Sequence, residues 1–462
     1  MTSVFSKEEL SKIFSKQIQS GINDVCINSN DAKFGDLFVA LKGKKTDGHK
    51  FVKQAIDNGA ILAIVEEDID GIDEKKLVKV ESSYKALLEL AKYNIEKTNA
   101  RYIGITGSVG KTTTKDMIYH ILSQFPDGGN IHATRKNFNS QIGLPICVAT
   151  MPRNTKIGIF EMGMSNFGDI KKLINIVPPA VSIISGICET HLEFFDSVWD
   201  ICKAKAEIFE TLIPQEFAII PADSPYTVFL ENRARKCGVQ EVFSFGFQKS
   251  DAHIISYNYV DEGISIVMEI LGEKIEYRIR CYNDSCILNS ASAILAAYAV
   301  SKIQLQELAD VIGSFLPSQK RGENIFFKER NLIVVDDSYN ACPTSVRAAI
   351  KSLSRYKTRR KILVIGDMLE LGLDSVHYHE NLSATIDKFG IDLVFACGKF
   401  SLSLFNNLVD SKKGAWRENS LEISKKVLNE IHDGDCILVK GSNSMGMSLV
   451  VETIRKWVNH VL

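Results

Sequence analysis

The stretch Tyr102-Ile-Gly-Ile-Thr-Gly-Ser-Val-Gly-Lys-Thr-Thr-Thr114 decides the fold of this chain. Its apolar start predicts a short buried strand, its glycines predict a tight loop, and the apolar positions that follow recur at helical spacing. Gly107 and Gly110 let the backbone approach a polyphosphate, and the N-terminus of the helix supplies positive potential. We expect Lys111 to reach the terminal phosphates and the Thr112 hydroxyl to ligate magnesium.

This loop departs from the common phosphate-binding pattern at one position. Residue 105 is isoleucine, where that pattern has its first glycine. The alternative interpretation is an ordinary turn between a strand and a helix. Because the glycine, lysine and threonine roles agree directly after a clear strand, the sequence favours nucleotide binding.

Two later strands end in side chains that suit a metal ion. The segment 156–163 predicts a strand with Glu161 at its C-terminal end, and the strand predicted at 181–184 leads to His191. Ligand groups gather at the carboxyl ends of parallel strands. A lone histidine is more often structural, but this position makes His191 a candidate ligand. Magnesium prefers oxygen, so a nitrogen ligand suggests a second, softer metal position.

A lysine lies in the apolar stripe of the helix predicted at 197–212. Val198, Ile201, Ile208, Phe209 and Leu212 recur at helical spacing, and Lys205 falls on their face, while Lys203 points roughly 160° away. An ammonium that faces inward must be paired, deprotonated or chemically altered. The alternative is a lysine that snorkels from the edge of the stripe.

Length and composition indicate a multidomain cytoplasmic protein. A chain of 462 residues exceeds one ordinary core, so two or three domains are expected. The net charge of −1 gives no sign of affinity for nucleic acid or membranes, and no apolar run reaches about 18 residues. The ten cysteines include no Cys-x-x-Cys pair. Several, such as Cys147, Cys397 and Cys436, lie in apolar, strand-like runs, so we expect free thiols in a reducing cytosol. The N-terminus lacks the pattern of an export signal.

The order of predicted elements divides the chain into three α/β domains. Residues 1–97 predict a small mixed module, and residues 98–316 carry the phosphate loop, short hairpin strands between 251 and 280, and a helix from Asn289. Residues 317–462 alternate strands and helices, which predicts a Rossmann-like parallel sheet covered on both faces.

Two charged residues open the third domain. Asp337 ends its first strand, where it could meet a ribose or an arriving amine, and Arg321 precedes it as a candidate for the γ-phosphate. Both residues also fit the alternative of ordinary surface charges.

Six strings together resemble the Mur ligase family, and they keep that family's order over nearly the whole chain. They are 106–114 (TGSVGKTTT), 137–145 (NFNSQIGLP), 161–163 (EMG), 190–193 (THLE), 204–209 (AKAEIF) and 336–343 (DDSYNACP). The last string, with 366–372 (GDMLELG), is similar to the MurF branch of that family. The resemblance implies three domains: a UDP-sugar-binding domain, a P-loop ATPase-like domain with a parallel sheet, and a Rossmann-like domain.

The resemblance also implies an ADP-forming amide ligase of cell-wall synthesis, and hence a role in cell shape and division. Such an enzyme adds D-alanyl-D-alanine to UDP-MurNAc-tripeptide through an acyl phosphate, as a cytoplasmic monomer that acts on small molecules. It uses ATP and two Mg²⁺ ions, and the lysine matching Lys205 carries a carbamate derived from CO₂. The implied nucleotide-binding residues are Gly107, Ser108, Gly110, Lys111, Thr112, Thr113, Asn289, Arg321 and Asp337. The implied metal-binding residues are Thr112, Glu161, His191 and Lys205, and catalysis is assigned to the last three with Lys111. The implied substrate-binding residues are Ser29, Asn139, Ser140 and Asn340.

Four positions differ from the family's motifs and leave alternatives open. Asn28, Asn30, Leu288 and Asn443 stand where the family has other residues, so one alternative is a MurF-like ligase for a different acid and amine. A nucleotide-binding scaffold without catalysis is a third interpretation, which the joint presence of Lys111, Glu161, His191 and Lys205 disfavours. Whether the third peptide residue is diaminopimelate or lysine stays open.

Overall fold

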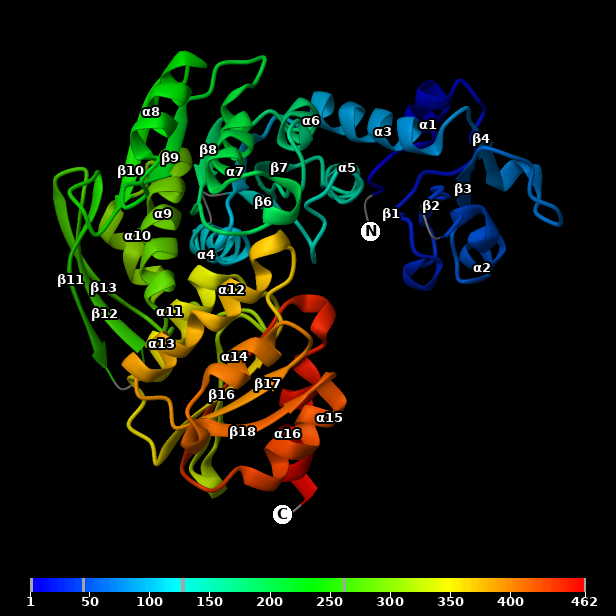
Figure 1. Cartoon of the computed structure of the whole chain (residues 1–462). Helices are drawn as coiled ribbons and strands as arrows, with labels where there is room; N and C mark the ends of the chain where they lie inside the picture. Colours follow the sequence, from blue (N-terminus) through cyan, green and yellow to red (C-terminus); the bar gives the residue numbers. More distant parts are fainter. Residues whose placement is uncertain (1–2, 44–45, 126–128, 261–262, 461–462) are drawn as a thin grey trace.

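The computed structural model describes residues 3–43, 46–125, 129–260 and 263–460, which form three β-sheets with flanking helices (Figure 1). The N-terminal sheet is fully parallel, in the order β1-β2-β3-β4. Its strands are β1 (Val25–Cys26), β2 (Leu37–Val39), β3 (Leu62–Val65) and β4 (Leu77–Lys79). Its helices are α1 (Lys7–Phe14), α2 (Val52–Asp57) and α3 (Ser83–Lys97). β2 and β3 are short apolar runs that are buried throughout, as expected for parallel strands covered on both faces.

The middle sheet has the order β13-β12-β11-β10-β9-β8-β5-β7-β6. Neighbours are parallel from β6 to β11, and β11, β12 and β13 continue the sheet as antiparallel strands, which confirms the predicted hairpins. The strands are β5 (Arg101–Thr106), β6 (Asn130–Ala133), β7 (Thr155–Glu161), β8 (Val181–Ile184), β9 (Phe217–Pro221), β10 (Glu241–Gly246), β11 (Ala252–Val260), β12 (Gly263–Ile270) and β13 (Glu273–Ile279).

Helices cover both faces of the middle sheet because its strands alternate their apolar side chains between two cores. They are α4 (Lys111–Ser123), α5 (Gly143–Ala149), α6 (Asp169–Ile176), α7 (Val198–Lys205), α8 (Thr227–Lys236), α9 (Asp284–Ser301) and α10 (Leu305–Ile312). α4, α9 and α10 share one core with the sheet, and α5 to α8 share the other. The central strand β5 lies between β7 and β8, so its C-terminal end opens at a switch point of the sheet.

The C-terminal sheet has the order β14-β15-β19-β16-β17-β18, and only the β14–β15 pair among its described strands is antiparallel. Its strands are β14 (Glu323–Phe327), β15 (Leu332–Asp337), β16 (Arg360–Gly366), β17 (Leu393–Cys397), β18 (Lys413–Arg417) and β19 (Asp435–Lys440). Its helices are α11 (Pro343–Leu353), α12 (Ser375–Glu380), α13 (Leu382–Lys388), α14 (Ser401–Asn407), α15 (Ser420–Glu430) and α16 (Ser448–His460). The predicted alternation of strands and helices is confirmed, and β14 and β18 form the two edges of the sheet.

The predicted helix 197–212 is wrong in its second half. The α-helix ends at Lys205, and residues Ala206–Phe209 continue as a 3₁₀ helix. The Glu207 carboxylate accepts hydrogen bonds from the backbone N–H groups of Gly168 and Lys171, and so caps the start of α6. The chain then leaves the helical path, and Leu212 is exposed rather than part of the apolar face.

Three smaller predictions are also corrected. α9 begins at Asp284, before the expected Asn289, because the Asn283 side chain caps the Ser285 N–H. Cys147 lies in α5 rather than in a strand. Cys281 and Cys286 form a disulfide, while Cys147, Cys397 and Cys436 are free and buried as expected.

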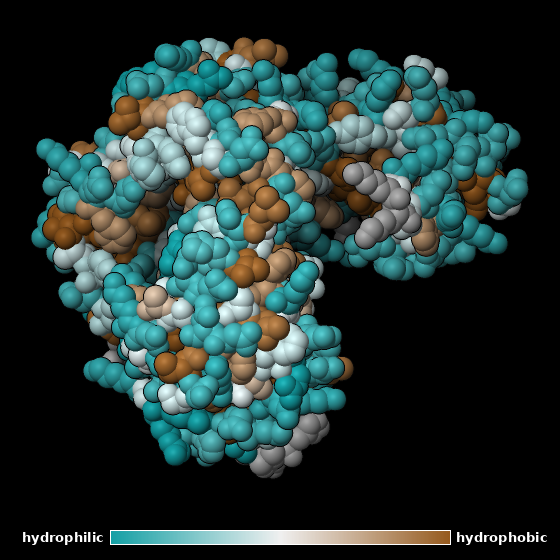
Figure 2. Space-filling model, viewed as in Figure 1, coloured by the Kyte–Doolittle hydropathy of each residue, from teal (hydrophilic) through white to brown (hydrophobic). Residues whose placement is uncertain are grey.

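Within the described ranges, no helix has both the length and the apolar character needed to cross a bilayer. Hydrophilic residues cover most of the face seen in Figure 2, and hydrophobic ones lie in scattered groups.

Candidate active site

The phosphate loop adopts the strand-loop-helix form that its sequence predicts. β5 ends at Thr106, and α4 begins at Lys111 after Gly110, whose φ of +85° lies in the left-handed region. A Cβ at Gly110 would lie 2.5 Å from Asn289 Oδ1, so this position also needs glycine for space. The Lys111 ammonium donates to the Gly107 carbonyl at 2.6 Å, which folds this side chain back over the loop.

A carboxylate from the neighbouring strand lies against the loop. Glu161, at the end of β7, accepts a hydrogen bond of 2.7 Å from the Thr112 hydroxyl and another of 2.7 Å from the Asn139 amide. Its side chain is buried. The amide of Asn139 therefore orients Glu161, a role that the sequence analysis did not foresee.

Lys205 is buried, as its place in the apolar stripe predicts, with 2% of its surface exposed. Its ammonium has no hydrogen bond or ion pair with any other described residue, although it borders the cavity next to the loop. Burial, followed by the positive charge of Lys111, holds the pKa of Lys205 well below its usual value. A lysine in this setting favours the neutral amine, which is the form that reacts with CO₂.

His191 follows β8 and meets a residue of the C-terminal domain. Its backbone φ is +59°, and its Nδ1 lies 2.5 Å from the Glu370 carboxylate, on the loop after β16. The Glu193 N–H also donates to the Glu370 carbonyl at 3.1 Å. Two domains thus meet at the predicted metal ligand.

The C-terminal domain supplies cationic and acidic groups to the same site. Lys440 Nζ, at the end of β19, lies 2.6 Å from the Asp337 carboxylate and donates to the Asn340 carbonyl at 2.9 Å. The Arg321 guanidinium stacks over the Tyr339 ring, 3.8 Å from its centroid. The sequence does not reveal the partner of Lys440, because Asp337 lies on a strand about one hundred residues away.

One cavity of about 730 Å³ joins nearly all the predicted residues. Its walls include Ser108, Gly110, Lys111, Thr112, Thr113, Asn139, Ser140, Glu161, His191, Lys205, Asn289, Arg321, Asp337 and Asn340. Gly107 does not line it, but its carbonyl accepts the hydrogen bond from the Lys111 ammonium. Ser29 is not in its walls either: it is buried in the N-terminal domain, and its hydroxyl donates to Gln54 Oε1 at 2.8 Å. The resemblance assigns Ser29 to the UDP-sugar contact of the N-terminal domain, and that role stays a prediction.

The donor set of this cavity fits a divalent cation. The Thr112 hydroxyl and the Glu161 carboxylate are the oxygen ligands that magnesium prefers, and they lie beside the phosphate loop. His191 and Lys205 border the same space. A carbamate on Lys205 would replace an isolated buried amine with an anionic oxygen ligand, so these residues fit both the ion and the modification.

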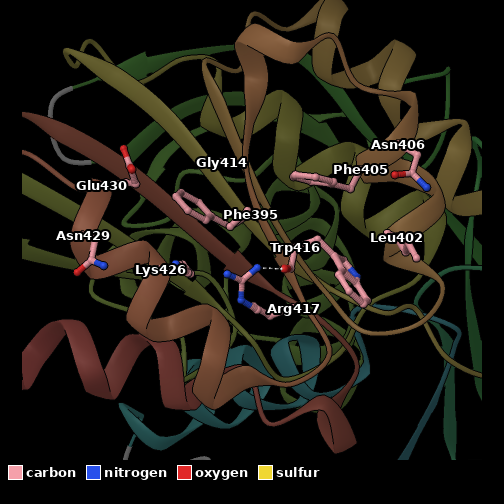
Figure 3. A pocket seen from close by; sticks show the side chains of 11 residues that line it. Phe395, Leu402, Phe405, Asn406, Gly414, Trp416, Arg417, Lys426, Asn429 and Glu430 are labelled. Atoms are coloured by element: carbon pink, nitrogen blue, oxygen red, sulfur yellow. Dashed lines mark hydrogen bonds between the residues drawn. The ribbon is translucent and has the colours of Figure 1, made fainter.

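A second cavity of about 490 Å³ lies at the far edge of the C-terminal sheet (Figure 3). Trp416 and Arg417 from the edge strand β18 border it, with Phe405 of α14 and Lys426 of α15. The Arg417 guanidinium donates to the Trp416 carbonyl. None of the predicted site residues lines this cavity, so we do not assign the chemistry to it.

Comparisons with known proteins identify the family models and relatives that this sequence matches. Three family models match in order: "Mur ligase family, catalytic domain" over residues 21–101, "Mur ligase middle domain" over 105–297 and "Mur ligase, glutamate ligase domain" over 321–443. The chain is similar to the UDP-N-acetylmuramoyl-tripeptide--D-alanyl-D-alanine ligase of Rickettsia prowazekii, with 31% identity over 97% of this chain and 99% of that protein. The protein of that name from Bacillus subtilis is 32% identical over 94% of both chains.

Solved structures show the same similarity. The crystal structure of MurF from Acinetobacter baumannii matches with a TM-score of 0.86 and 27% identity, over 97% of this chain and 98% of that one. MurF ligase from Thermotoga maritima in complex with ADP matches with a TM-score of 0.81 and 26% identity, over 95% and 99%.

Proposed function

This chain belongs to the Mur ligase family, and from that premise we propose that it is the ADP-forming ligase that joins D-alanyl-D-alanine to UDP-MurNAc-tripeptide in peptidoglycan synthesis. The observation that carries this proposal is the single cavity in which the phosphate loop, Glu161, His191 and Lys205 meet Arg321 and Asp337 of the C-terminal domain. The relatives named above, which match over nearly their whole length, support the choice of substrates.

We divide the labour among three domains with boundaries after residues 97 and 316. The first domain is proposed to bind the UDP-sugar, the second ATP and the third the incoming amine. Each chain carries every group of the cavity, so a monomer suffices for the reaction. We propose a cytoplasmic reaction, because the ATP that it consumes is supplied in the cytoplasm.

The proposed chemistry is activation of a carboxylate followed by capture by an amine. The tripeptide carboxylate attacks the γ-phosphorus of ATP, the bond to the β-phosphate oxygen breaks, and an acyl phosphate and ADP form. The amine of D-alanyl-D-alanine then attacks the acyl carbon, phosphate leaves with the electron pair of the C–O bond, and the amine loses a proton. Several anions must meet in this sequence, so the site needs cations more than acid–base groups.

Specific side chains answer that need. Lys111 and Arg321 neutralise phosphate charge, while Thr112, Glu161, His191 and carbamylated Lys205 would hold two Mg²⁺ ions. Bound magnesium would supply charge neutralisation and orientation of the phosphate oxygens. Lys205 acquires its carbamate when the neutral amine attacks the carbon of CO₂, forms an N–C bond and releases one proton. Closure of the domains over this cavity would also keep water from the acyl phosphate.

The test is a reaction of the purified protein with ATP, UDP-MurNAc-tripeptide and D-alanyl-D-alanine, followed by mass spectrometry. We expect a UDP-MurNAc-pentapeptide and one phosphate released per product, with phosphate release that needs both substrates. Parallel reactions with the diaminopimelate and lysine tripeptides identify the third residue. Absence of product from both, with turnover on another acid and amine, would instead favour the alternative of a MurF-like ligase with different substrates.

A further inference from the structure

The contact between His191 and Glu370 joins a proposed metal ligand to a different domain. His191 follows β8 of the middle sheet, and Glu370 follows β16 of the C-terminal sheet, 179 residues later. The 2.5 Å side-chain contact is reinforced by the backbone, since the Glu193 N–H donates to the Glu370 carbonyl. The two segments are therefore held together at two points.

The backbone at both residues is held in an uncommon conformation. His191 has φ +59° and Glu370 has φ +62°, which is the left-handed region that residues with a Cβ seldom occupy. Such conformations persist where the surroundings fix them, and they cluster at functional sites. Here both residues with this conformation take part in the same contact of an imidazole with a carboxylate.

The contact with Glu370 determines which nitrogen of the His191 ring can bind a metal. A carboxylate at Nδ1 fixes the proton on that nitrogen, so Nε2 keeps its lone pair. No hydrogen bond from another described residue engages Nε2, and His191 borders the cavity. A carboxylate behind a histidine in this way orients the ring and makes it a more basic metal ligand.

Other polar links between the two domains lack this feature. Glu189 accepts hydrogen bonds from Thr344 and Arg347, and Asp284 pairs with Lys351 at 2.8 Å. These links can hold the domains closed, but none of their partners is a proposed metal ligand. Among the described polar links between the domains, the contact of Glu370 with His191 is therefore the one through which domain closure can change a proposed metal ligand.

We propose that Glu370 is a positioning residue that completes the metal site from the C-terminal domain. When the domains close, its carboxylate sets the tautomer and orientation of His191, so the cation is bound tightly only in the closed enzyme. This inference rests on the proposed function for the presence of a cation, but it does not depend on which acid and amine are joined.

The experiment measures Mn²⁺ binding by electron paramagnetic resonance, with a non-hydrolysable ATP analogue bound to the full chain. We expect E370Q to weaken the Mn²⁺ affinity about tenfold, and E370A to weaken it more because the amide of glutamine can still accept a hydrogen bond. In activity assays the same variants should need correspondingly more Mg²⁺. K351Q is the matched control, since it removes a link between the same domains without touching a proposed metal ligand, and its Mn²⁺ affinity should fall clearly less than that of E370Q.

A second comparison separates positioning from simple latching. If Glu370 acts through His191, E370Q should cost no further Mn²⁺ affinity in an H191A background. Equal losses from E370Q and K351Q, an unchanged affinity in E370Q, or an additive loss in the double variant would each overturn the proposal. Circular dichroism confirms that each variant is folded. Failure of the proposed function is distinguishable, because Mn²⁺ binding is measured without either ligase substrate.

Discussion

Asp284 offers the sharpest prediction about how the two larger domains close. It lies in the first turn of α9 in the middle domain, and its carboxylate accepts hydrogen bonds of 2.8 and 3.0 Å from Arg355 and one of 2.8 Å from Lys351. Both cations belong to the C-terminal domain. The Tyr259 hydroxyl, from the middle sheet, also donates to this carboxylate. The variant D284N keeps the shape of the side chain and removes its charge.

The magnitude follows from the pKa of Asp284. Burial raises it, but the hydrogen bonds from Arg355, Lys351 and Tyr259 outweigh burial and hold the pKa at about 2, below the ordinary 3.8. The carboxylate is 18% exposed, so solvent screening is limited. At 1.36 kcal/mol for each tenfold change, the ionised form stabilises the folded protein by about 2 kcal/mol. Only the contacts with Arg355 and Lys351 act between the domains, so the loss in the ratio of closed to open enzyme is at most a factor of about 30.

The sign of the pH dependence is fixed by the lowered pKa. The stabilisation is fully present above pH 3.8 and disappears as the pH falls through about 2, because protonation then removes the charge. The difference in unfolding free energy between wild type and D284N should therefore be about 2 kcal/mol near neutral pH and shrink below pH 4.

Small-angle X-ray scattering is the assay for closure, with urea unfolding for stability. D284N should have the larger radius of gyration at every nucleotide concentration. The control is D433N, which removes an exposed partner of Arg330 within the C-terminal domain and should cost less than about 1 kcal/mol. Scattering of D284N that matches the wild type, together with an unfolding loss no larger than that of D433N, would refute the reasoning.

Two further predictions test the loop and the domain contact. G110A should weaken ATP binding in calorimetry by at least tenfold, because a Cβ there lies 2.5 Å from Asn289 Oδ1. The control is G168A, which has a similar φ of +83° and no atom within 4 Å of its Cβ position, and which should leave ATP binding unchanged. Equal losses of ATP affinity in the two variants would contradict the steric argument. The sulfurs of Cys188 and Cys342 lie 3.7 Å apart across the domain contact, so mild oxidation with diamide should link them, and peptide mapping by mass spectrometry detects the link. Saturating ATP analogue should speed this cross-link, C342S should abolish it, and two thiols that stay free in the nucleotide-bound enzyme would contradict the closed arrangement.

Local patterns in the sequence predicted the groups that each chain segment carries. Spacing within a few residues was enough to predict the phosphate loop, Glu161 at a strand end and the inward Lys205. The structure brings all three to one cavity. The end of α7 could not be predicted in the same way. It depends on Glu207 turning to cap α6, a contact between elements that are distant in sequence.

Partners that lie far apart in the chain are the other part that sequence alone does not reveal. Glu370 lies in the string 366–372 that is similar to the MurF branch, but that string does not indicate its partner, His191 of the middle domain. Lys440 contacts Asp337 of its own domain, about one hundred residues away in the chain. The substrate contacts implied for Asn139 and Ser29 stay predictions. The Asn139 amide donates to Glu161, and the Ser29 hydroxyl donates to Gln54 Oε1, and neither partner could be read from the motif. The hydrogen-bond partners of a side chain depend on the folded structure, and a sequence motif does not contain them.

The central claim is that Lys205 carries a carbamate beside the nucleotide, and ¹³C nuclear magnetic resonance tests it most directly. The protein is incubated with ¹³C-bicarbonate, ATP analogue and Mg²⁺, and the spectrum is compared with that of the folded K205A variant. We predict one carbamate carbon resonance in the wild type that is absent from K205A and fades, together with activity, when CO₂ is removed. A fully active wild-type enzyme with no resonance that depends on Lys205 would contradict the account.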